Sequence, residues 1–313
     1  MILRINPTFI GLFAVLVWGV GLPVIRLIEA QVGVPGVIGA VFAGAGVFGL
    51  IKQRLLHEPL PNKVIFRNPY LYGRWVFFVL HEALILTAIS IVQKQYVPFV
   101  ILLNYLWPTA IIFSCISLAG MKVARWGIFI MGSMIVLTSL SIEILGSGGI
   151  SSAMFSNSTD VLAYILAFVG AVSWGLYCAL SRRAGDATGG SSVLPFFQLT
   201  LGLALPVSLL PGISMWSNLT ADLLLLLCII CIVQFIAYLC WDSGMRRGNV
   251  VILSLCADFI PWISLLTSYL VLGTEIGNRT TASAICLVIG AMITRYSTLQ
   301  KSPDLAKEEL PGV

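Results

Sequence analysis

The sequence predicts an all-α membrane protein, with ten transmembrane helices arranged as two inverted five-helix repeats around a central cavity. Three observations predict this fold. The 313 residues are 58% apolar and only 10% charged, whereas a soluble domain carries about 25% charged residues. Lys and Arg follow a one-sided pattern between the apolar stretches, and a proline-centred segment of the first half recurs in the second half.

Ten apolar stretches have about the 20 residues that cross the bilayer hydrocarbon as a helix. Segments rich in Gly, Ser and Pro separate them, as is typical of loops. The first five helices are expected near residues 8–28, 34–51, 71–93, 97–119 and 124–145, and the second five near residues 159–181, 192–212, 219–243, 249–273 and 277–298.

The first stretch is expected to belong to the fold and not to be a cleaved signal peptide. Its apolar core runs from Phe9 to Leu27, which is longer than the roughly 7–15 residues of a signal-peptide core. It contains Trp18-Gly19, and Trp174-Gly175 repeats this pair in the sixth stretch. The repeated Trp-Gly pair indicates that both stretches belong to an internal repeat of the fold.

The distribution of basic residues predicts the orientation. With the N-terminus in the cytoplasm and ten alternating helices, all but three of the 18 Lys and Arg residues lie on the cytoplasmic side, as the positive-inside rule requires. The exceptions are Arg26, Lys94 and Arg279. Both termini are then cytoplasmic. The net charge of +5 is explained by topology, so no nucleic-acid partner is expected.

An internal repeat indicates the architecture. Aligning Pro108 with Pro261 also aligns Ala119-Gly120 with Leu272-Gly273. Five helices per half is an odd number, so the second half enters the membrane from the opposite side. We expect a first repeat over residues 1–150, a second over 151–300 and a cytoplasmic tail over 301–313. Inverted repeats predict a transporter whose substrate site lies near the midplane, with access alternating between the two sides.

Three segments resemble a known family. They are the Trp18-Gly19 helix start, the stretch Asn104-Tyr105-Leu106-Trp107-Pro108-Thr109 and the Trp174-Gly175 echo. Together they resemble the EamA-type drug/metabolite transporter superfamily, and the length and the Leu103–Thr109 segment resemble its aromatic amino acid exporter branch. The resemblance covers nearly the whole chain. It implies a ten-helix protein of the bacterial inner membrane that exports aromatic and other neutral amino acids.

Two ionisable residues lie near the middle of the third stretch. His81 and Glu82 are adjacent, so they point about 100° apart on a helix. Ionisable side chains inside membrane helices are costly and usually face the protein interior. We expect His81 to line the cavity and Glu82 to pair with a donor on a neighbouring helix. The alternative is a packed polar pair that holds helices together.

The fourth stretch carries the sharpest group of candidate residues. Asn104, Trp107 and Pro108 share one stripe at helical spacing. Pro108 has no N–H, so it leaves the carbonyl of Asn104 without its helical donor. We expect this carbonyl and the Asn104 side chain to bind the polar end of a substrate. The alternative is a simple kink used for packing or hinge motion.

The ninth stretch repeats the proline break. Pro261 leaves the carbonyl of Ala257 without a donor, and Asp258 stands next to it as the most isolated acid by position. Asp258 is expected to pair with a substrate ammonium, to carry a proton, or to contact a neighbouring Ser or Asn.

Aromatic residues provide the other candidate contacts. Trp174 and Tyr177 share a face of the sixth helix, and Tyr238 lies in the eighth. Trp18 occupies the Trp174-equivalent place in the first helix. We expect these rings, with Trp107, to stack on an aromatic side chain or to contact an ammonium group.

The sequence argues against several other classes of protein. All seven cysteines fall inside apolar stretches, where they pack as small apolar residues. Cys228 and Cys231 have metal-ligand spacing, but no His or acid stands next to them in the sequence. No nucleophile–base arrangement or phosphate-binding Gly-Lys-Ser/Thr loop is present. We therefore expect no enzyme, metal or cofactor.

The resulting hypothesis is a carrier with a small amino acid as its substrate and membrane lipid around it. Its oligomeric state is not determined by the sequence, and a monomer is compatible with it. The alternative is a proton-coupled exporter of drugs or other small metabolites, in which Glu82 or Asp258 carries the proton.

Overall fold

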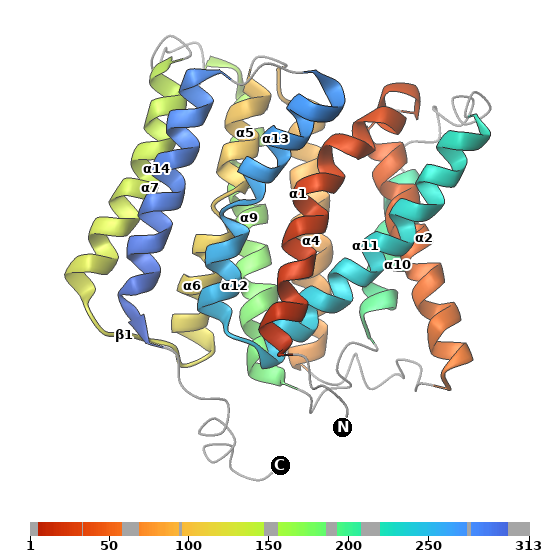
Figure 1. Ribbon diagram of the computed structural model, residues 1–313, viewed down its shortest axis with the longest axis horizontal. Helices are drawn as coiled ribbons and strands as arrows, with labels where there is room; N and C mark the ends of the chain where they lie inside the picture. The colour runs from red at the N-terminus through yellow and green to blue at the C-terminus, as the bar shows by residue number, and fades with distance from the viewer. Residues whose placement is uncertain are drawn as a thin grey trace.

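The computed structural model describes residues 6–32, 34–57, 69–93, 96–146, 156–185, 193–207, 220–273 and 277–299. In these residues the chain forms a bundle of antiparallel helices and one two-stranded antiparallel sheet (Figure 1). The elements are α1 (Pro7–Val32), α2 (Val34–Leu55), α4 (Pro69–Ile91), α5 (Val97–Asn104), α6 (Trp107–Leu118), β1 (Lys122–Val123), α7 (Trp126–Gly146), α9 (Ser158–Ala184), α10 (Leu194–Val207), α11 (Ala221–Arg247), α12 (Val250–Ala257), α13 (Ile260–Leu272), α14 (Asn278–Tyr296) and β2 (Thr298–Leu299).

The lengths and compositions of the helices suit a bilayer. Among the described residues, six helical segments are long and apolar enough to cross a membrane, and four shorter apolar helices accompany them. Large apolar side chains lie on the outside of the bundle, such as Phe9 at 68%, Leu225 at 62% and Leu270 at 70% exposure. The expected helical class is therefore confirmed. The count of ten transmembrane helices stays a prediction, and the boundary predicted at residues 150 and 151 and the tail from 301 lie outside the described residues.

Two predicted helices are interrupted rather than merely kinked. The stretch expected over 97–119 divides into α5 and α6, and the stretch expected over 249–273 divides into α12 and α13. In each case a proline stands in the first turn after the interruption, Pro108 in α6 and Pro261 in α13. Because proline has no amide hydrogen, it is accommodated in a first turn, where no intrahelical donor is needed.

The two interrupted helices also end alike. Gly120 follows α6 with φ +70° and Gly273 follows α13 with φ +66°. Pro108 and Gly120 are as far apart in the sequence as Pro261 and Gly273. A left-handed residue after a helix is usually glycine, because a Cβ is strained there. The two segments therefore share their break and their terminus.

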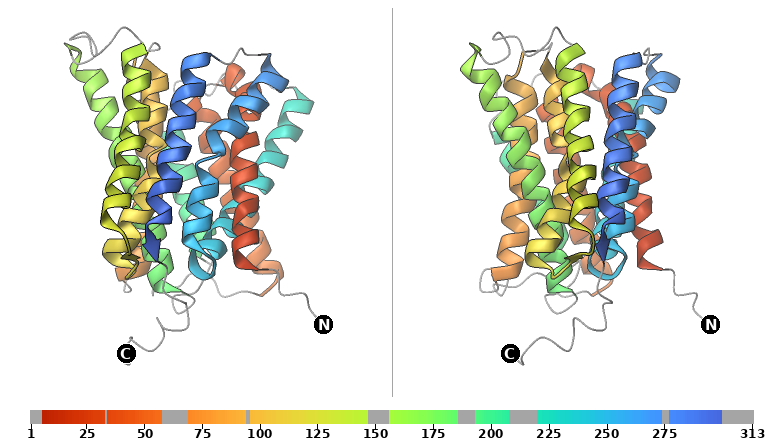
Figure 2. Two further views of the ribbon diagram at one scale, coloured as in Figure 1. Left: turned by 60° about the vertical axis from the view of Figure 1, so that its left-hand side comes forward. Right: turned by 90° about the vertical axis from the view of Figure 1, so that its left-hand side faces the viewer.

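The helices pack in a regular set of pairs (Figures 1 and 2). α7 packs on α14 and α2 on α10, while α1 packs on α11 and α13 and α9 packs on α4 and α6. Glycines permit the closest contacts. A Cβ on Gly202 of α10 would lie 2.1 Å from Ala43 N on α2, and a Cβ on Gly132 of α7 would lie 2.4 Å from Thr294 N on α14. Small residues at such interfaces let membrane helices approach closely.

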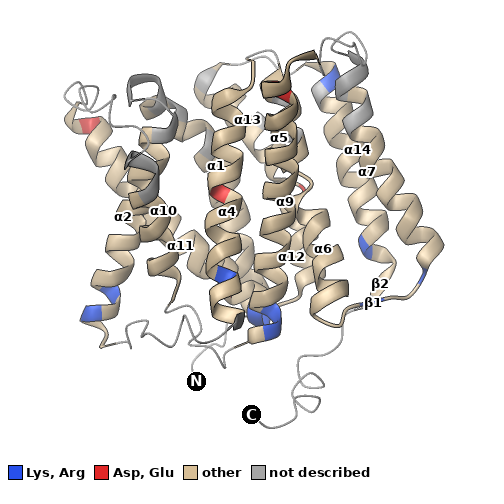
Figure 3. Ribbon diagram, turned by 180° about the vertical axis from the view of Figure 1, so that it is seen from behind, with Lys and Arg blue, Asp and Glu red and all other residues tan. Residues whose placement is uncertain are grey.

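Basic residues gather at one end of the bundle, where α1 begins and α14 ends (Figures 1 and 3). They include residues in the last turns of α2, α9, α11 and α14. However, Arg74, Arg246 and Arg295 are 0%, 5% and 3% exposed and contact buried carboxylates. These three arginines, expected on the cytoplasmic side, are therefore charged groups buried inside the bundle.

Candidate functional site

Four tryptophans from four helices meet inside the bundle. Trp18 comes from α1, Trp107 from α6, Trp174 from α9 and Trp241 from α11. The Trp18 ring lies 6.4 Å from that of Trp107, 6.0 Å from that of Trp174 and 5.2 Å from that of Trp241. Most of these contacts are edge-on or tilted, which is the preferred geometry of aromatic pairs. We refer to these four residues and the rings that contact them as the aromatic cluster.

Three further rings extend the aromatic cluster. Tyr238 of α11 lies 5.2 Å from Trp18, and Tyr177 of α9 lies 4.9 Å from Trp174. Phe78 of α4 contacts both tyrosines, at 5.2 Å and 5.5 Å. The structure thus brings together the five aromatic residues singled out in the sequence, and adds Trp241 and Phe78. In the sequence Phe78 does not differ from other apolar residues. The one signal is its spacing of three residues from His81, which puts both on the same face of a helix.

His81 and Glu82 lie beside these rings. The His81 ring is 4.9 Å from Trp174, and its Nδ1–H donates to the carbonyl of Gly170 at 2.9 Å. The Tyr238 hydroxyl donates to Glu82 Oε1 at 2.5 Å. His81 Nε2 lies 4.0 Å from the same oxygen. A donor on a neighbouring helix therefore holds Glu82, and the tyrosine links it to the aromatic cluster.

Two buried polar atoms next to the cluster have no hydrogen-bond partner in the part of the chain that the structure describes. They are Asn104 Oδ1 and Trp18 Nε1. Asn104 is the last residue of α5, three positions before Trp107. Buried polar atoms are normally paired, so an unpaired one needs an explanation. One is an acceptor and the other a donor, as a zwitterionic ligand would require.

Asp258 lies at the second helix break in a different environment. It is 1% exposed and forms an ion pair with Arg295 Nη1 of α14. Arg295 Nε also donates to Ser254 Oγ at 2.9 Å. In the sequence Asp258 is the most isolated acid by position, and in the fold it pairs with Arg295 of the tenth expected stretch, a partner not expected from the sequence. The helix break before Pro261 therefore lies next to the ion pair of Asp258 and Arg295.

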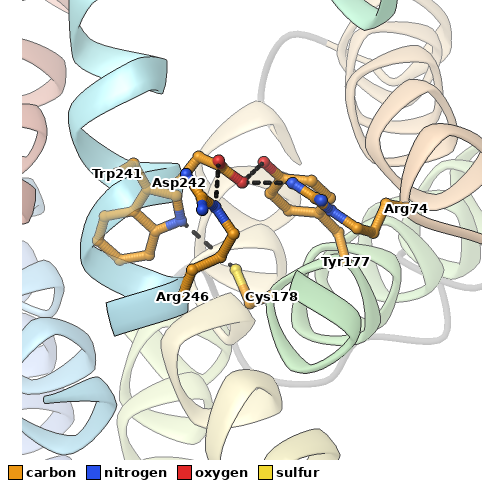
Figure 4. Close-up of polar contacts among 6 residues, drawn as sticks. All are labelled: Arg74, Tyr177, Cys178, Trp241, Asp242 and Arg246. Carbon is orange, nitrogen blue, oxygen red and sulfur yellow. Dashed lines mark hydrogen bonds and ion pairs between the residues drawn. The ribbon is translucent and has the colours of Figure 1, made fainter. Parts of the chain in front are cut away.

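A second buried ion cluster was missed in the sequence. Arg74 Nη2 of α4 donates to Asp242 Oδ1 of α11 at 2.6 Å, and Arg246 Nε donates to Asp242 Oδ2 at 2.8 Å. The Tyr177 hydroxyl donates to Asp242 Oδ1 at 3.3 Å. Figure 4 shows these groups meeting from three helices. Asp242 and Arg246 are four residues apart, which is the sequence signal that could have found them.

A thiol is also part of this region. Trp241 Nε1–H donates to Cys178 Sγ at 3.4 Å (Figure 4). The described cysteines are free thiols. Among the described residues, no group of three or more His, Cys, Asp or Glu side chains is placed to hold a metal ion.

Known proteins with similar sequences are transporters. Residues 161–296 match the EamA-like transporter family. The chain is 27% identical to the aromatic amino acid exporter YddG of Salmonella typhimurium, over 95% of this chain and 99% of that protein. It is 25% identical to YddG of Escherichia coli K12, over 94% and 98%.

Two further likenesses agree with these. A stretch of 153 residues is 26% identical to an uncharacterized transporter of Clostridium kluyveri and covers 48% of this chain and 49% of that protein. A protein whose crystal structure is known shares the fold. Its TM-score is 0.69 at 22% sequence identity, over 93% of this chain and 98% of the other. The second half of the chain thus resembles the EamA-like transporter family, nearly the whole chain has a YddG-like sequence, and the apolar helices agree with a multi-pass membrane transporter.

Proposed function

We propose that this transporter exports aromatic and other neutral amino acids from the cytoplasm by alternating access. The observation that carries the proposal is the aromatic cluster, in which rings from α1, α4, α6, α9 and α11 meet. Tryptophan and tyrosine offer large flat apolar faces, which suit an aromatic or apolar side chain. The names of the two YddG relatives, aromatic amino acid exporters, support the same substrate class.

Polar atoms around the cluster suit the backbone end of an amino acid. Asn104 Oδ1 is an acceptor for an ammonium N–H, and Trp18 Nε1 is a donor for a carboxylate oxygen. His81 and Glu82 contribute further polar atoms at the edge of the rings. We assign substrate contact to Trp18, His81, Asn104, Trp107, Trp174, Tyr177 and Tyr238. In this proposal the breaks before Pro108 and Pro261 act as hinges.

We also propose that the bundle consists of ten transmembrane helices in two inverted repeats, over residues 1–150 and 151–300. The shared break and terminus of α5–α6 and α12–α13 support this. The packing pairs support it too. In the two repeats α1 corresponds to α9, α4 to α11 and α6 to α13. The contact between α1 and α11 then corresponds to that between α9 and α4, and the contact between α1 and α13 to that between α9 and α6. Such symmetry permits one half to rock against the other around a central site.

The proposed location is the bacterial inner membrane, with both termini in the cytoplasm. The gathering of basic residues where α1 begins and α14 ends supports this orientation (Figure 3), because cytoplasmic loops are enriched in Lys and Arg. Each chain contains both proposed halves, so a monomer surrounded by lipid is a sufficient unit.

Proton-coupled export of drugs or other metabolites is the second candidate. Glu82 favours it, because its side chain is only 14% exposed beside the aromatic cluster, and buried carboxylates in membrane helices mark proton relays in many transporters. Asp258 fits this role less well, because Arg295 already holds it.

Transport by the purified protein in liposomes tests both candidates. The panel contains labelled phenylalanine, tryptophan, alanine, lysine and one cationic drug. We expect saturable movement of the aromatic and neutral amino acids, reduced at least about tenfold by Trp107→Ala. Trp126→Ala is the control, since this tryptophan is 59% exposed on the outer face. Movement of the drug alone, and only with a pH gradient, would replace the first candidate with the second.

A further inference from the structure

Arg74 lies on the same face of α4 as the aromatic cluster. Arg74, Phe78 and His81 are spaced by four and three residues, so their side chains follow one another along one side of the helix. Phe78 and His81 both contact the Trp174 ring, at 6.0 Å and 4.9 Å. Arg74 is therefore the next side chain below the cluster, toward the end of the bundle where α4 begins.

The guanidinium of Arg74 is buried but incompletely paired. Its exposure is 0%, and Nη2 donates to Asp242 Oδ1 at 2.6 Å. Nε and Nη1 have no hydrogen-bond partner within the described residues. A buried charged donor left unsatisfied is costly, and arginine usually meets a carboxylate through two parallel hydrogen bonds. Arg74 makes only one.

Asp242 is already shared among several donors and does not complete the Arg74 hydrogen bonds. Its Oδ2 accepts from Arg246 Nε at 2.8 Å, and its Oδ1 also accepts from the Tyr177 hydroxyl at 3.3 Å. Figure 4 shows Arg246 and Arg74 approaching this carboxylate from different sides. A second carboxylate would complete the hydrogen bonding of Arg74.

Tyr177 connects Arg74 to the aromatic cluster. Its hydroxyl contacts the carboxylate that Arg74 contacts, while its ring lies 4.9 Å from Trp174 and 5.5 Å from Phe78. Arg74 and His81 are seven residues apart, so about 10 Å of helix separates them. A ligand with a ring among the tryptophans and an anionic group toward Arg74 matches this arrangement.

We propose that Arg74 supplies the charged partner of the substrate's carboxylate, with Nε and Nη1 donating to its oxygens in addition to the donor already assigned to Trp18. This rests on the proposed amino acid export and deepens it. The substrate class becomes amino acids with an unmodified carboxylate, and amino alcohols and amines with the same side chain are excluded. Asp242 keeps Arg74 oriented and competes with the substrate for it.

Binding to the purified protein in lipid nanodiscs tests the proposal, with phenylalanine compared with phenylalaninol. The two compounds share the ring and the ammonium group, and only phenylalanine has a carboxylate. The wild-type protein should prefer phenylalanine. Arg74→Gln should lower phenylalanine affinity about 10- to 100-fold, the range of charge-assisted hydrogen bonds, and should change phenylalaninol affinity by less than about twofold. Arg74→Lys should recover part of the preference.

Two further variants complete the test. Arg183→Gln removes an exposed guanidinium of α9, which donates to Leu118 O at 2.9 Å, and should leave the preference unchanged. Asp242→Asn retains Arg74 and removes its competitor, so the folded protein should show an increased preference for phenylalanine. Arg74→Lys keeps the positive charge beside Asp242 and provides the second measurement if Arg74→Gln does not fold.

Three outcomes would overturn the assignment of Arg74. They are equal loss of both ligands in Arg74→Gln, equal binding of both ligands by the wild-type protein, and an unchanged or reduced preference in Asp242→Asn. Binding of neither compound by the wild-type protein would overturn the proposed amino acid export as well.

Discussion

The two interrupted helices have the same backbone design and different side chains. α5–α6 and α12–α13 each break after eight residues, place a proline in the following turn and end at a left-handed glycine. At the first break Asn104 is followed by Tyr105, and Trp107 enters the aromatic cluster. At the corresponding positions of the second break stand Ala257, Asp258 and Ile260.

The difference separates what the fold needs from what a substrate needs. The second break carries the ion pair of Asp258 with Arg295, so its carboxylate has a charged partner within the protein, although Asp258 Oδ1 and Arg295 Nη2 have no hydrogen-bond partner among the described residues. The first break leaves Asn104 Oδ1 buried without a partner among the described residues. We infer that the second break is stabilising and the first contacts substrate, although both are built on one backbone pattern.

Removing the carboxylate at the second break should have the largest effect on stability. Asp258→Asn leaves the buried Arg295 charge without its counterion, which costs about 3–5 kcal/mol. Tyr105→Phe, the matched change at the first break, should cost about 1 kcal/mol or less. Thermal unfolding in detergent, followed by the monodisperse fraction, measures both.

A double replacement controls this prediction. Asp258→Leu with Arg295→Met removes both charges and should be more stable than Asp258→Asn alone, since apolar residues of similar volume often replace a buried ion pair well. Similar losses for Asp258→Asn and Tyr105→Phe would show that the ion pair does not stabilise the second break.

Restoring the amide hydrogen at each break should separate transport from stability. Pro108→Ala lets α5 and α6 join and so displaces Trp107, and we expect amino acid transport to fall about tenfold with a small change in stability. Pro261→Ala shifts Asp258 from Arg295, and we expect it to lower thermal stability by about 1–3 kcal/mol, the scale of a disturbed buried polar contact. Amino acid uptake and thermal unfolding are measured for both variants. A loss of stability in Pro108→Ala together with a loss of transport in Pro261→Ala would contradict the assignment of the first break to substrate and of the second to stability.

The sequence predicts the helices well because the features that determine where a helix begins and ends lie in the same stretch of sequence. Apolar length, proline, glycine and basic residues are all visible in the chain, and the expected spans match the observed bounds within a few residues where both lie in the described residues, with the largest differences at the ends of α1, α2 and α11. The five aromatic candidates lie together in the structure as well, and the shared helix face of Trp174 and Tyr177 was already visible in their spacing.

What the sequence does not predict is which distant charges meet. Arg74 contacts Asp242, 168 positions away, and Arg295 contacts Asp258 across two helices. Both arginines lie near helix ends, where basic residues normally face water, so a count of charges by membrane side does not reveal their buried partners. These partners meet because α4 and α11 both pack on α9 and because α12 packs on α14, and helix packing is a tertiary property.

The two left-handed glycines should behave alike. A Cβ at Gly120 or Gly273 would meet nothing within 4 Å, so only backbone strain opposes a side chain there. Gly120→Ala and Gly273→Ala should each cost about 1–2 kcal/mol, measured by the same thermal unfolding. Costs that differ by more than about 1 kcal/mol would show that the two termini are not equivalent.

The smallest effect on stability is expected at Asn104, and it tests the comparison most directly. Asn104→Ala gives the first break the alanine that the second break has as Ala257. Because Asn104 Oδ1 has no partner in the described part of the chain, its removal should change stability by less than about 0.5 kcal/mol. Phenylalanine binding should nevertheless weaken about fivefold, the worth of one hydrogen bond. Binding of 3-phenylpropanoate, which lacks the ammonium group, should not change. A loss of stability without this ligand difference would place Asn104 with the structural residues of the second break, and the first break would then be no more specialised for substrate than the second.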